Sequence, residues 1–440
     1  MKPRLLFTLL LFANLIPLKS ETPAVGAWPH WRGPLATGYS PSANPPLNWS
    51  EAVNIAWKVP IPGRGTSSPV VWNDRIFVTT AIPAGSDGIT LETIRGSLSN
   101  PLRVSVIQSQ AFTLLAIDRA DGRTRWSRTA IETMPHEGTH PDGTWASSSP
   151  VTDGNSVFAF FGSYGVFCYD MEGNLRWKAD LGDMRIKLGF GEASSPALHG
   201  NHLVINWDHE DQSFIVALDK HTGREIWKTE RAEGTTWATP LITEHNGRAQ
   251  VITGATNSVR SYDLETGHLL WESPGLTPNA IPTPVASSDM VFVTSGFRGN
   301  ALQAIRLDKA IGDISNTSAI AWTHNRDTPY VPSPLLHDDT LYFTKHNRAI
   351  LSAFEASTGN EKYSRQRLNG IRAVYASPVG AAGRIYITGR NGTTLVLQHG
   401  TEFEILAKNV LDDGFDASAA LVGNDIFLRG YENLYCVRRR

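Results

Sequence analysis

Eight polar or aromatic residues stand at related positions, each three to five residues ahead of the Pro (once Ala) of a repeated Ser/Thr-Pro phrase. They are Arg64, Trp145, Glu192, Trp237, Asn279, Tyr330, Tyr375 and Asp416. Brought together, they would form a pocket that stacks on a flat polar ligand and hydrogen-bonds its edges. Their offset from the marker residue varies by two positions, so some of them must face away. The alternative is that these side chains fill a channel by stacking and hydrogen-bonding to one another.

Two further polar clusters could in principle bind metal. The stretch WDHEDQS places Asp208 and Glu210 two residues apart, which suits calcium, but a solvated turn is the expected role. The stretch MPHEGTHPDGT contains His136, Glu137 and His140, yet HEGTH lacks the HExxH spacing and a helix to carry it. The sequence contains no GxSxG motif and no phosphate-binding glycine loop. We therefore expect no catalytic residue and no metal ligand.

The elements that would position the pocket are repeats. One phrase, ALDKHTGREIWK at 217–228, recurs as AIDRADGRTRWS (116–127), CYDMEGNLRWK (168–178), SYDLETGHLLWE (261–272) and AFEASTGNEKYS (353–364). The second is Ser/Thr-Pro followed by aliphatic residues, with its marker at 69, 150, 196, 240, 284, 334, 378 and 419. After the first unit, which is longer by a segment from about 83 to 112, the markers recur at intervals typical of a propeller.

Each unit contains three or four short apolar runs separated by polar turns, which predicts four antiparallel strands, one propeller blade. Gly223 and its counterparts are expected at the positive φ of a tight turn, and Asp219 is expected to hydrogen-bond that turn. The aromatic residue closing each phrase is expected to pack against the neighbouring blade. These structural aromatics are Trp57, Trp126, Trp177, Trp227, Trp271, Trp322, Tyr363 and Phe403.

The two ends of the chain determine the blade number. The last unit stops at LYCVRRR after three strands, whereas NIAWKV at 54–59 precedes the first unit and has no strands before it. If that segment supplies the missing strand, no sheet edge stays open. The prediction is an all-β, eight-bladed propeller of four-stranded antiparallel blades over residues 28–440, closed by an N-terminal strand.

Composition and charge limit the function classes. Lys2 and Arg4 precede an apolar run that is too short to span a bilayer, so residues 1–20 are predicted to be a signal peptide, with cleavage as late as residue 27. The protein is expected to be exported, periplasmic or extracellular, monomeric and not membrane-spanning. A net charge of −2 argues against nucleic-acid binding. Cys168 and Cys436 occupy equivalent repeat positions and are expected to be unpaired in separate blades.

The A-x-D-x-x-T-G-x-x-x-W phrase resembles the tryptophan-docking motif of PQQ-type (quinoprotein) propellers. The opening WPHWRGP at 28–34 is similar to the start of exported PQQ-like repeat proteins of planctomycetes and verrucomicrobia. The resemblance covers nearly the whole mature chain. It implies either a dehydrogenase that binds pyrroloquinoline quinone (PQQ) with calcium, or a non-catalytic, BamB-like scaffold. The sequence departs from the enzymes, since it has no adjacent Cys pair and is shorter than they usually are.

The functional expectation is therefore a non-catalytic binding or scaffold propeller of the cell envelope, with no cofactor. The alternative is a PQQ-dependent oxidoreductase with its cofactor in the central funnel, and a carbohydrate- or peptide-binding funnel is a third. The segment 88–110 is the expected site for an envelope protein or peptide partner, because exposed strand edges recruit partner strands.

Overall fold

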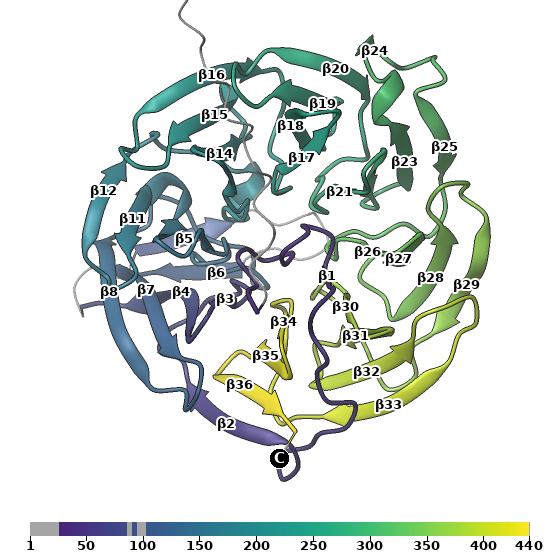
Figure 1. The fold of residues 1–440 in the computed structure, drawn as a ribbon. Helices are drawn as coiled ribbons and strands as arrows, with labels where there is room; N and C mark the ends of the chain where they lie inside the picture. Colours follow the sequence, from purple (N-terminus) through teal and green to yellow (C-terminus); the bar gives the residue numbers. More distant parts are fainter. Residues whose placement is uncertain (1–25, 86–89, 95–102, 440) are drawn as a thin grey trace, which may run out of the picture.

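The computed structural model describes residues 26–85, 90–94 and 103–439, and they form a ring of eight four-stranded sheets around a central axis (Figure 1). Within each blade, antiparallel strands run in order from the axis to the rim. The predicted eight-bladed propeller is confirmed. The predicted signal peptide at 1–20 lies outside the described residues.

The eight sheets follow the repeats along the chain, and the blades are numbered here in that order. Blade 1 consists of β3 (Val70–Trp72), β4 (Arg75–Pro83), β7 (Gln110–Asp118) and β8 (Thr124–Thr133), and blade 2 consists of β9 (Val151–Thr152), β10 (Ser156–Phe160), β11 (Val166–Asp170) and β12 (Leu175–Ala179). Blade 3 consists of β13 (Ala197–His199), β14 (His202–Trp207), β15 (Ser213–Asp219) and β16 (Glu225–Arg231), and blade 4 consists of β17 (Leu241–His245), β18 (Arg248–Thr253), β19 (Ser258–Asp263) and β20 (Leu269–Pro274). Blade 5 consists of β21 (Val285–Ala286), β22 (Met290–Ser295), β23 (Ala301–Arg306) and β25 (Ile320–His324). Blade 6 consists of β26 (Leu335–His337), β27 (Thr340–Thr344), β28 (Ile350–Glu355) and β29 (Glu361–Arg367). Blade 7 consists of β30 (Val379–Ala381), β31 (Arg384–Thr388), β32 (Thr393–Gln398) and β33 (Ile405–Val410). Blade 8 is β34 (Ala420–Val422), β35 (Asp425–Arg429), β36 (Asn433–Arg438) and β2 (Ile55–Pro60).

Blade 8 closes the ring with strands from both ends of the chain. Strand β2 pairs antiparallel with β36, with Trp57 opposite Cys436 and Lys58 opposite Tyr435. The N-terminal strand therefore covers the edge that the C-terminal strand would leave open, as predicted. Cys168 in blade 2 and Cys436 in blade 8 are both buried and free, as expected.

The residues before β2 cross one face of the ring, and residues 26–50 are called the strap here. Trp28 pairs with Val71 of blade 1, and β1 (Tyr39–Ser40) lies parallel to β30 of blade 7. Figure 1 shows the strap running from the axis to the rim, where the chain enters β2. The strap thus covers one end of the central channel.

The indoles of the outer strands lock neighbouring blades together. Trp177 of blade 2 donates its Nε1–H to the carbonyl of Lys220 in blade 3, at 2.8 Å. Beneath that ring lies Gly223, whose φ is +72°. A Cβ atom at this position would lie 2.5 Å from the ring, so the turn requires glycine for its φ and for the approach of the indole. The same indole-to-carbonyl bond is made by Trp57, Trp126, Trp227 and Trp322, on the carbonyls of Arg119, Met171, Leu264 and Ala356.

Three of the eight aromatics differ from this scheme. Trp271 donates to Gln250 within its own blade, at 3.1 Å, because the following turn of blade 5 is expanded. That turn adds β24 (Gly312–Asp313), which pairs parallel to β20 with Gly312 opposite Trp271. Tyr363 packs edge-on against Phe403, and neither side chain makes a hydrogen bond to the next blade.

Few elements stand outside the blades. Strands β5 (Thr90–Ile94) and β6 (Arg103–Ile107) pair antiparallel with each other. In the sequence they lie between β4 and β7, within the segment predicted to protrude. Three short 3₁₀ turns are η1 (Gly162–Tyr164), η2 (Lys187–Gly189) and η3 (Leu307–Lys309). Across the described part of the chain, no helix has the length and apolarity needed to cross a membrane.

Candidate functional site

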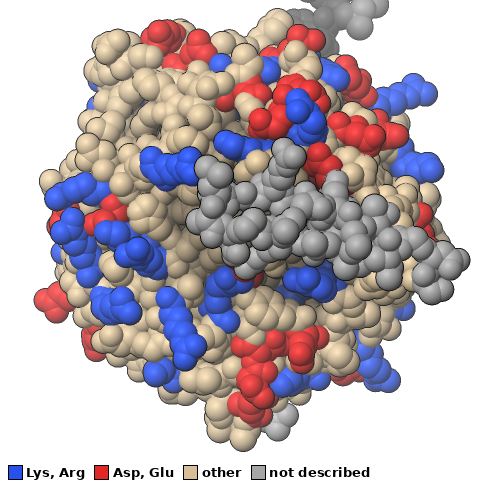
Figure 2. All heavy atoms as spheres, turned by 180° about the vertical axis from the view of Figure 1, so that it is seen from behind, with Lys and Arg blue, Asp and Glu red and all other residues tan. Residues whose placement is uncertain are grey.

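A cavity of about 450 Å³ occupies the axis of the ring. Trp31 of the strap lines one end of it, and the connections between blades line the rest. On the face opposite the strap, Figure 2 shows acidic and basic side chains interspersed over the surface. Because polar and aromatic residues of successive blades converge on this cavity, it is the candidate functional site.

Hydroxyl groups form a hydrogen-bonded circle around the cavity. The residue before each marker is Ser or Thr, and its backbone N–H donates to the hydroxyl of the equivalent residue in the next blade, at 2.9–3.0 Å. The circle runs through Ser68, Ser149, Ser195, Thr239, Thr283, Ser333, Ser377 and Ser418. It is broken once, between Thr239 and Thr283, where the Thr283 hydroxyl has no partner in the part of the chain that the structure describes. The Ser/Thr-Pro phrase therefore joins the blades at the axis, as the indoles do at the rim.

Six of the eight residues singled out by the sequence line the cavity. They are Glu192, Trp237, Asn279, Tyr330, Tyr375 and Asp416. Trp145 lies beside a smaller adjoining cavity instead, with its Nε1–H donated to the carbonyl of Glu137 at 3.0 Å. Arg64 is exposed and is not among the lining residues, because its backbone pairs with Ala81. The variation in offset separates these two from the other six.

Glu192 stands between the two cavities. Its carboxylate accepts hydrogen bonds from the backbone N–H and the hydroxyl of Ser163, at 2.7 and 2.5 Å. Burial raises the pKa of Glu192 to about 7, although both hydrogen bonds oppose the rise. The neighbouring indole of Trp237 donates to the carbonyl of Gly191 at 2.7 Å, which fixes its ring against the same loop.

A charged group spans the axis at the other side of the cavity. Arg390 donates to Asp416, at 2.7 and 3.1 Å, and to Asp142, at 3.0 Å. Tyr375 donates its hydroxyl to Asp142 at 3.2 Å, and the Arg390 guanidinium lies 4.1 Å from the centre of the Tyr375 ring. Burial raises the pKa of Asp416, opposed mainly by Arg390.

Asp142 and Arg390 were missed by the sequence reasoning. Asp142 lies in the stretch 134–144, where His136, Glu137 and His140 alone stood out as metal-binding residue types, and Arg390 lies in a turn between the second and third strands of blade 7. Neither position belongs to a repeated phrase. The available signal was the length and polarity of the loop between blades 1 and 2, which reaches across the axis to blade 7.

The acidic stretch 207–213 is a solvated turn only in part, since Glu210, Asp211 and Gln212 are exposed as expected but Asp208 and His209 are buried. Asp208 and Arg231 form an ion pair at 2.8 Å, and both side chains are 0% exposed. Thr236 also donates to Asp208, at 2.7 Å, so this carboxylate is used inside the blade. Glu210 accepts from the backbone N–H and hydroxyl of Thr235. The interior of the blade therefore accounts for Asp208, whose carboxylate pairs with Arg231.

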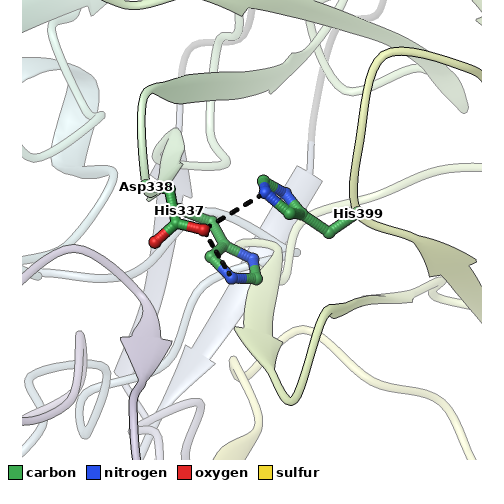
Figure 3. A group of neighbouring side chains, drawn as sticks. All are labelled: His337, Asp338 and His399. Carbon is green, nitrogen blue, oxygen red and sulfur yellow. Dashed lines mark ion pairs between the residues drawn. The ribbon is translucent and has the colours of Figure 1, made fainter.

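A histidine pair that the sequence did not reveal lies beside the strap (Figure 3). The rings of His337 and His399 are stacked at 3.8 Å, and Tyr39 stacks on the other side of His337 at 4.0 Å. The Nε2 atoms of both histidines lie near one carboxylate oxygen of Asp338, at 3.7 and 3.4 Å. A metal ion bound by imidazole lies close to the ring plane, and two stacked parallel rings share no such position. The geometry is that of an aromatic stack between blades 6 and 7 and the strap.

Both a family model and solved structures match this chain. The family model described as outer membrane protein assembly factor BamB matches residues 50–229, 169–283 and 211–440. No curated protein sequence matches the chain. BamB from Moraxella catarrhalis has a similar structure, with a TM-score of 0.54 and 14% identity over 79% of this chain and 100% of that one.

Two dehydrogenases have similar structures as well. A europium-containing methanol dehydrogenase has a TM-score of 0.62 and 10% identity, over 94% of this chain and 91% of that one. Quinohemoprotein alcohol dehydrogenase from Comamonas testosteroni has a TM-score of 0.60 and 10% identity, over 94% and 81%. Such low identities show a shared fold and leave the activity open. The family match spans nearly all of the ring, and the chain therefore belongs to the family of BamB-like, PQQ-repeat β-propellers.

Proposed function

We propose that this protein is a non-catalytic binding propeller of the cell envelope that holds a small ligand in its axial cavity. The carrying observation is that six residues from successive repeats line one cavity of about 450 Å³. Trp237, Tyr330 and Tyr375 offer aromatic surface, and the hydroxyl circle offers donors. Aromatic walls with a few convergent polar groups are typical of small-molecule sites.

The state of the carboxylates supports binding without turnover. Glu192 is held by Ser163, and Asp416 and Asp142 are held by Arg390. A general base must reach the proton it abstracts, and an activated nucleophile needs a base beside it. These acids are instead paired with fixed protein donors, which suits a rigid binding wall.

The quinoprotein alternative has one observation in its favour. Asn279 lines the cavity, and its side-chain oxygen has no hydrogen-bond partner among the described residues; amide oxygens are calcium ligands. The charge of the cavity opposes it, because PQQ is a tricarboxylate and the lining contains three carboxylates and neither Lys nor Arg. The guanidinium of Arg390 is already bound to two of those carboxylates, Asp142 and Asp416. This distribution of charge supports a cavity that binds a ligand other than PQQ.

Two experiments test the proposal. Purified protein is first mixed with PQQ and Ca²⁺ and assayed for cofactor uptake and dye-linked alcohol oxidation; stoichiometric uptake with turnover would overturn the proposal.

A small-molecule library is then screened by thermal shift. A true ligand of the cavity raises the Tm of the wild type and of Arg64→Ala, which lies outside the lining, but not of Tyr330→Ala. A library in which no compound separates these variants argues against a cavity ligand.

The envelope location and a protein partner belong to the same proposal. The proposed location rests on the charged and apolar start of the sequence, and cell fractionation with N-terminal sequencing of the mature protein tests it.

A partner role for the segment 88–110 rests on β5 and β6, which pair with each other and with no blade strand. Deleting residues 88–110 is expected to abolish crosslinking to an envelope partner while the Tm of the propeller is retained.

A further inference from the structure

The hydroxyl circle has an unused donor at nearly every position. Seven hydroxyls each accept a hydrogen bond from a backbone N–H, and none of them donates to an acceptor in the described part of the chain. All of these residues except Ser333 line the axial cavity. Each hydroxyl has one proton to donate, so the circle presents a set of O–H donors to whatever occupies the axis.

A buried positive charge lies at the same level, on the side of the strap. Arg32 is 0% exposed, and its guanidinium donates to the carbonyls of Pro334, Pro378 and Thr37, at 2.7 to 3.2 Å. Pro334 and Pro378 directly follow Ser333 and Ser377 of the circle. Among the described residues, no carboxylate lies within ion-pair distance of Arg32, and its Nε–H has no partner.

A second buried guanidinium repeats this pattern between blades 8 and 1. Arg429 donates to the carbonyls of Ser67 and Thr79, next to Ser68 of the circle, and it too is without a carboxylate in the described chain. A buried charge costs several kcal/mol unless an opposite charge compensates it. Two such cations beside a circle of hydroxyl donors contribute positive potential at the circle, and this local potential differs from that of the cavity wall lined by Asp142, Glu192 and Asp416.

We propose that the hydroxyl circle is an anion subsite, which takes a carboxylate or a small inorganic anion at the floor of the axial cavity. This inference rests on the proposed ligand-binding function and names the ligand class. The anionic group accepts from adjacent hydroxyls, and Arg32 stabilises it through the field rather than by direct contact. The acids Asp142, Asp416 and Glu192 also line the cavity, and they suit a neutral or cationic remainder of the ligand.

The first test is direct observation of the anion. Crystals of the full chain are grown or soaked in sodium bromide, and the anomalous signal of bromide is measured. The expected result is a peak within hydrogen-bond distance of two or more hydroxyls of the circle. A bromide-loaded crystal with peaks only on the outer surface, that is, an adventitious ion only, would overturn the proposal.

The second test uses matched variants in halide-free buffer. Ser195→Ala removes a donor of the circle, whereas Ser194→Ala removes the neighbouring buried hydroxyl, which donates to Ala238. Titration calorimetry with acetate is expected to show binding weakened about ten- to a hundredfold by Ser195→Ala and unchanged by Ser194→Ala, since Ser195 would donate a hydrogen bond to a charged group. Equal affinity in the two variants would contradict the assignment. Bromide without acetate binding assigns the circle to inorganic anions.

The outcomes separate this inference from the proposed function. An anion bound at the circle, with no organic ligand found for the cavity, would support the subsite and contradict the proposed function. An organic ligand that protects wild type but not Tyr330→Ala, with neither bromide nor acetate at the circle, would support the function and contradict the subsite.

Discussion

At the scale of single residues, glycine and tryptophan of the repeat act as one unit. Five indoles donate to a carbonyl in the next blade, and the glycine of that same turn lies against the ring. Glycine was predicted from its φ alone, and the approach of the indole is an additional reason that the sequence does not reveal. The close contact depends on a residue some 45 positions away, as for Trp177 and Gly223.

The contribution of that contact can be separated from the effect of φ. Gly223→Ala and Gly247→Ala both place a side chain at φ near +72°, but only at Gly223 would the new Cβ meet an indole, at 2.5 Å. Gly247→Ala is expected to cost ~1 kcal/mol and Gly223→Ala ~1–3 kcal/mol more, measured by urea unfolding. Equal costs would show that the indole moves aside freely.

The buried ion pair of blade 3 gives a second residue-scale prediction. Asp208→Asn leaves the Arg231 guanidinium buried without its counter-charge, and unfolding free energy is expected to fall by ~3–5 kcal/mol. Asp211→Asn, three residues on, removes an exposed partner of Arg185 and is expected to cost less than about 1 kcal/mol. Comparable losses for the two variants would mean that burial does not govern the pair.

The histidine stack predicts a dependence on pH. Burial and the neighbouring His399 lower the pKa of His337 to about 4, so between pH 6.5 and 4 the unfolded chain binds the proton and the folded chain does not. Stability is therefore complete above pH 6.5 and is lost as the pH falls toward 4, by on the order of 3 kcal/mol. In His337→Gln the slope of unfolding free energy against pH should flatten over this range, whereas exposed His268→Gln should keep it.

At the scale of elements, the junction between blades 4 and 5 is the exception in the ring. Trp271 does not reach the next blade, and the hydroxyl circle is interrupted between Thr239 and Thr283. The added strand β24 and the buried Ile314 take over, since Ile314 packs in the cluster that contains Trp271. The phrase SYDLETGHLLWE looks like every other copy, so its sequence does not predict this difference.

The role of β24 and Ile314 in joining blades 4 and 5 can be tested with two isoleucine variants. Ile314 is 0% exposed and Ile311 is 81% exposed. Ile314→Ala is expected to lower the unfolding free energy by ~2–5 kcal/mol, because it leaves a cavity beside Trp271, while Ile311→Ala should stay within about 0.5 kcal/mol of wild type. Hydrogen exchange should rise first in β20 and β23 of the Ile314 variant; unchanged exchange there would argue against a joining role.

At the scale of the whole molecule, the repeats predicted the eight blades and the closing strand, since markers and phrases recur in phase with the fold. Six residues that line the cavity were predicted from their position ahead of the repeated Ser/Thr-Pro phrase. Arg64 was predicted in the same way but does not line it, because the phase of the repeat fixes a residue's level in the blade and not the direction of its side chain. Arg32, Asp142 and Arg390 lie in non-repeating segments, and their contacts span the axis. Such contacts appear only once the ring is closed.

Closure itself is testable by truncation. A chain starting at residue 61 loses the strap and β2 and exposes the edge of β36, so it is expected to associate or aggregate. A chain starting at residue 26 retains both and should remain as the full mature protein does. Light scattering after size exclusion measures the difference. A well-behaved, cooperatively unfolding species starting at residue 61 would show that the ring does not need its N-terminal strand.

The pairing of β2 with β36 also orders events during synthesis. Trp57 and Cys436 are 436 − 57 = 379 positions apart, and they face each other in the finished sheet. At ribosomal speeds of about 5–20 residues per second, the first strand waits roughly 20–75 s for its neighbour to be translated. Throughout that interval β2 lacks its partner strand, so a segment translated before any of the blades is among the last to acquire its native pairing.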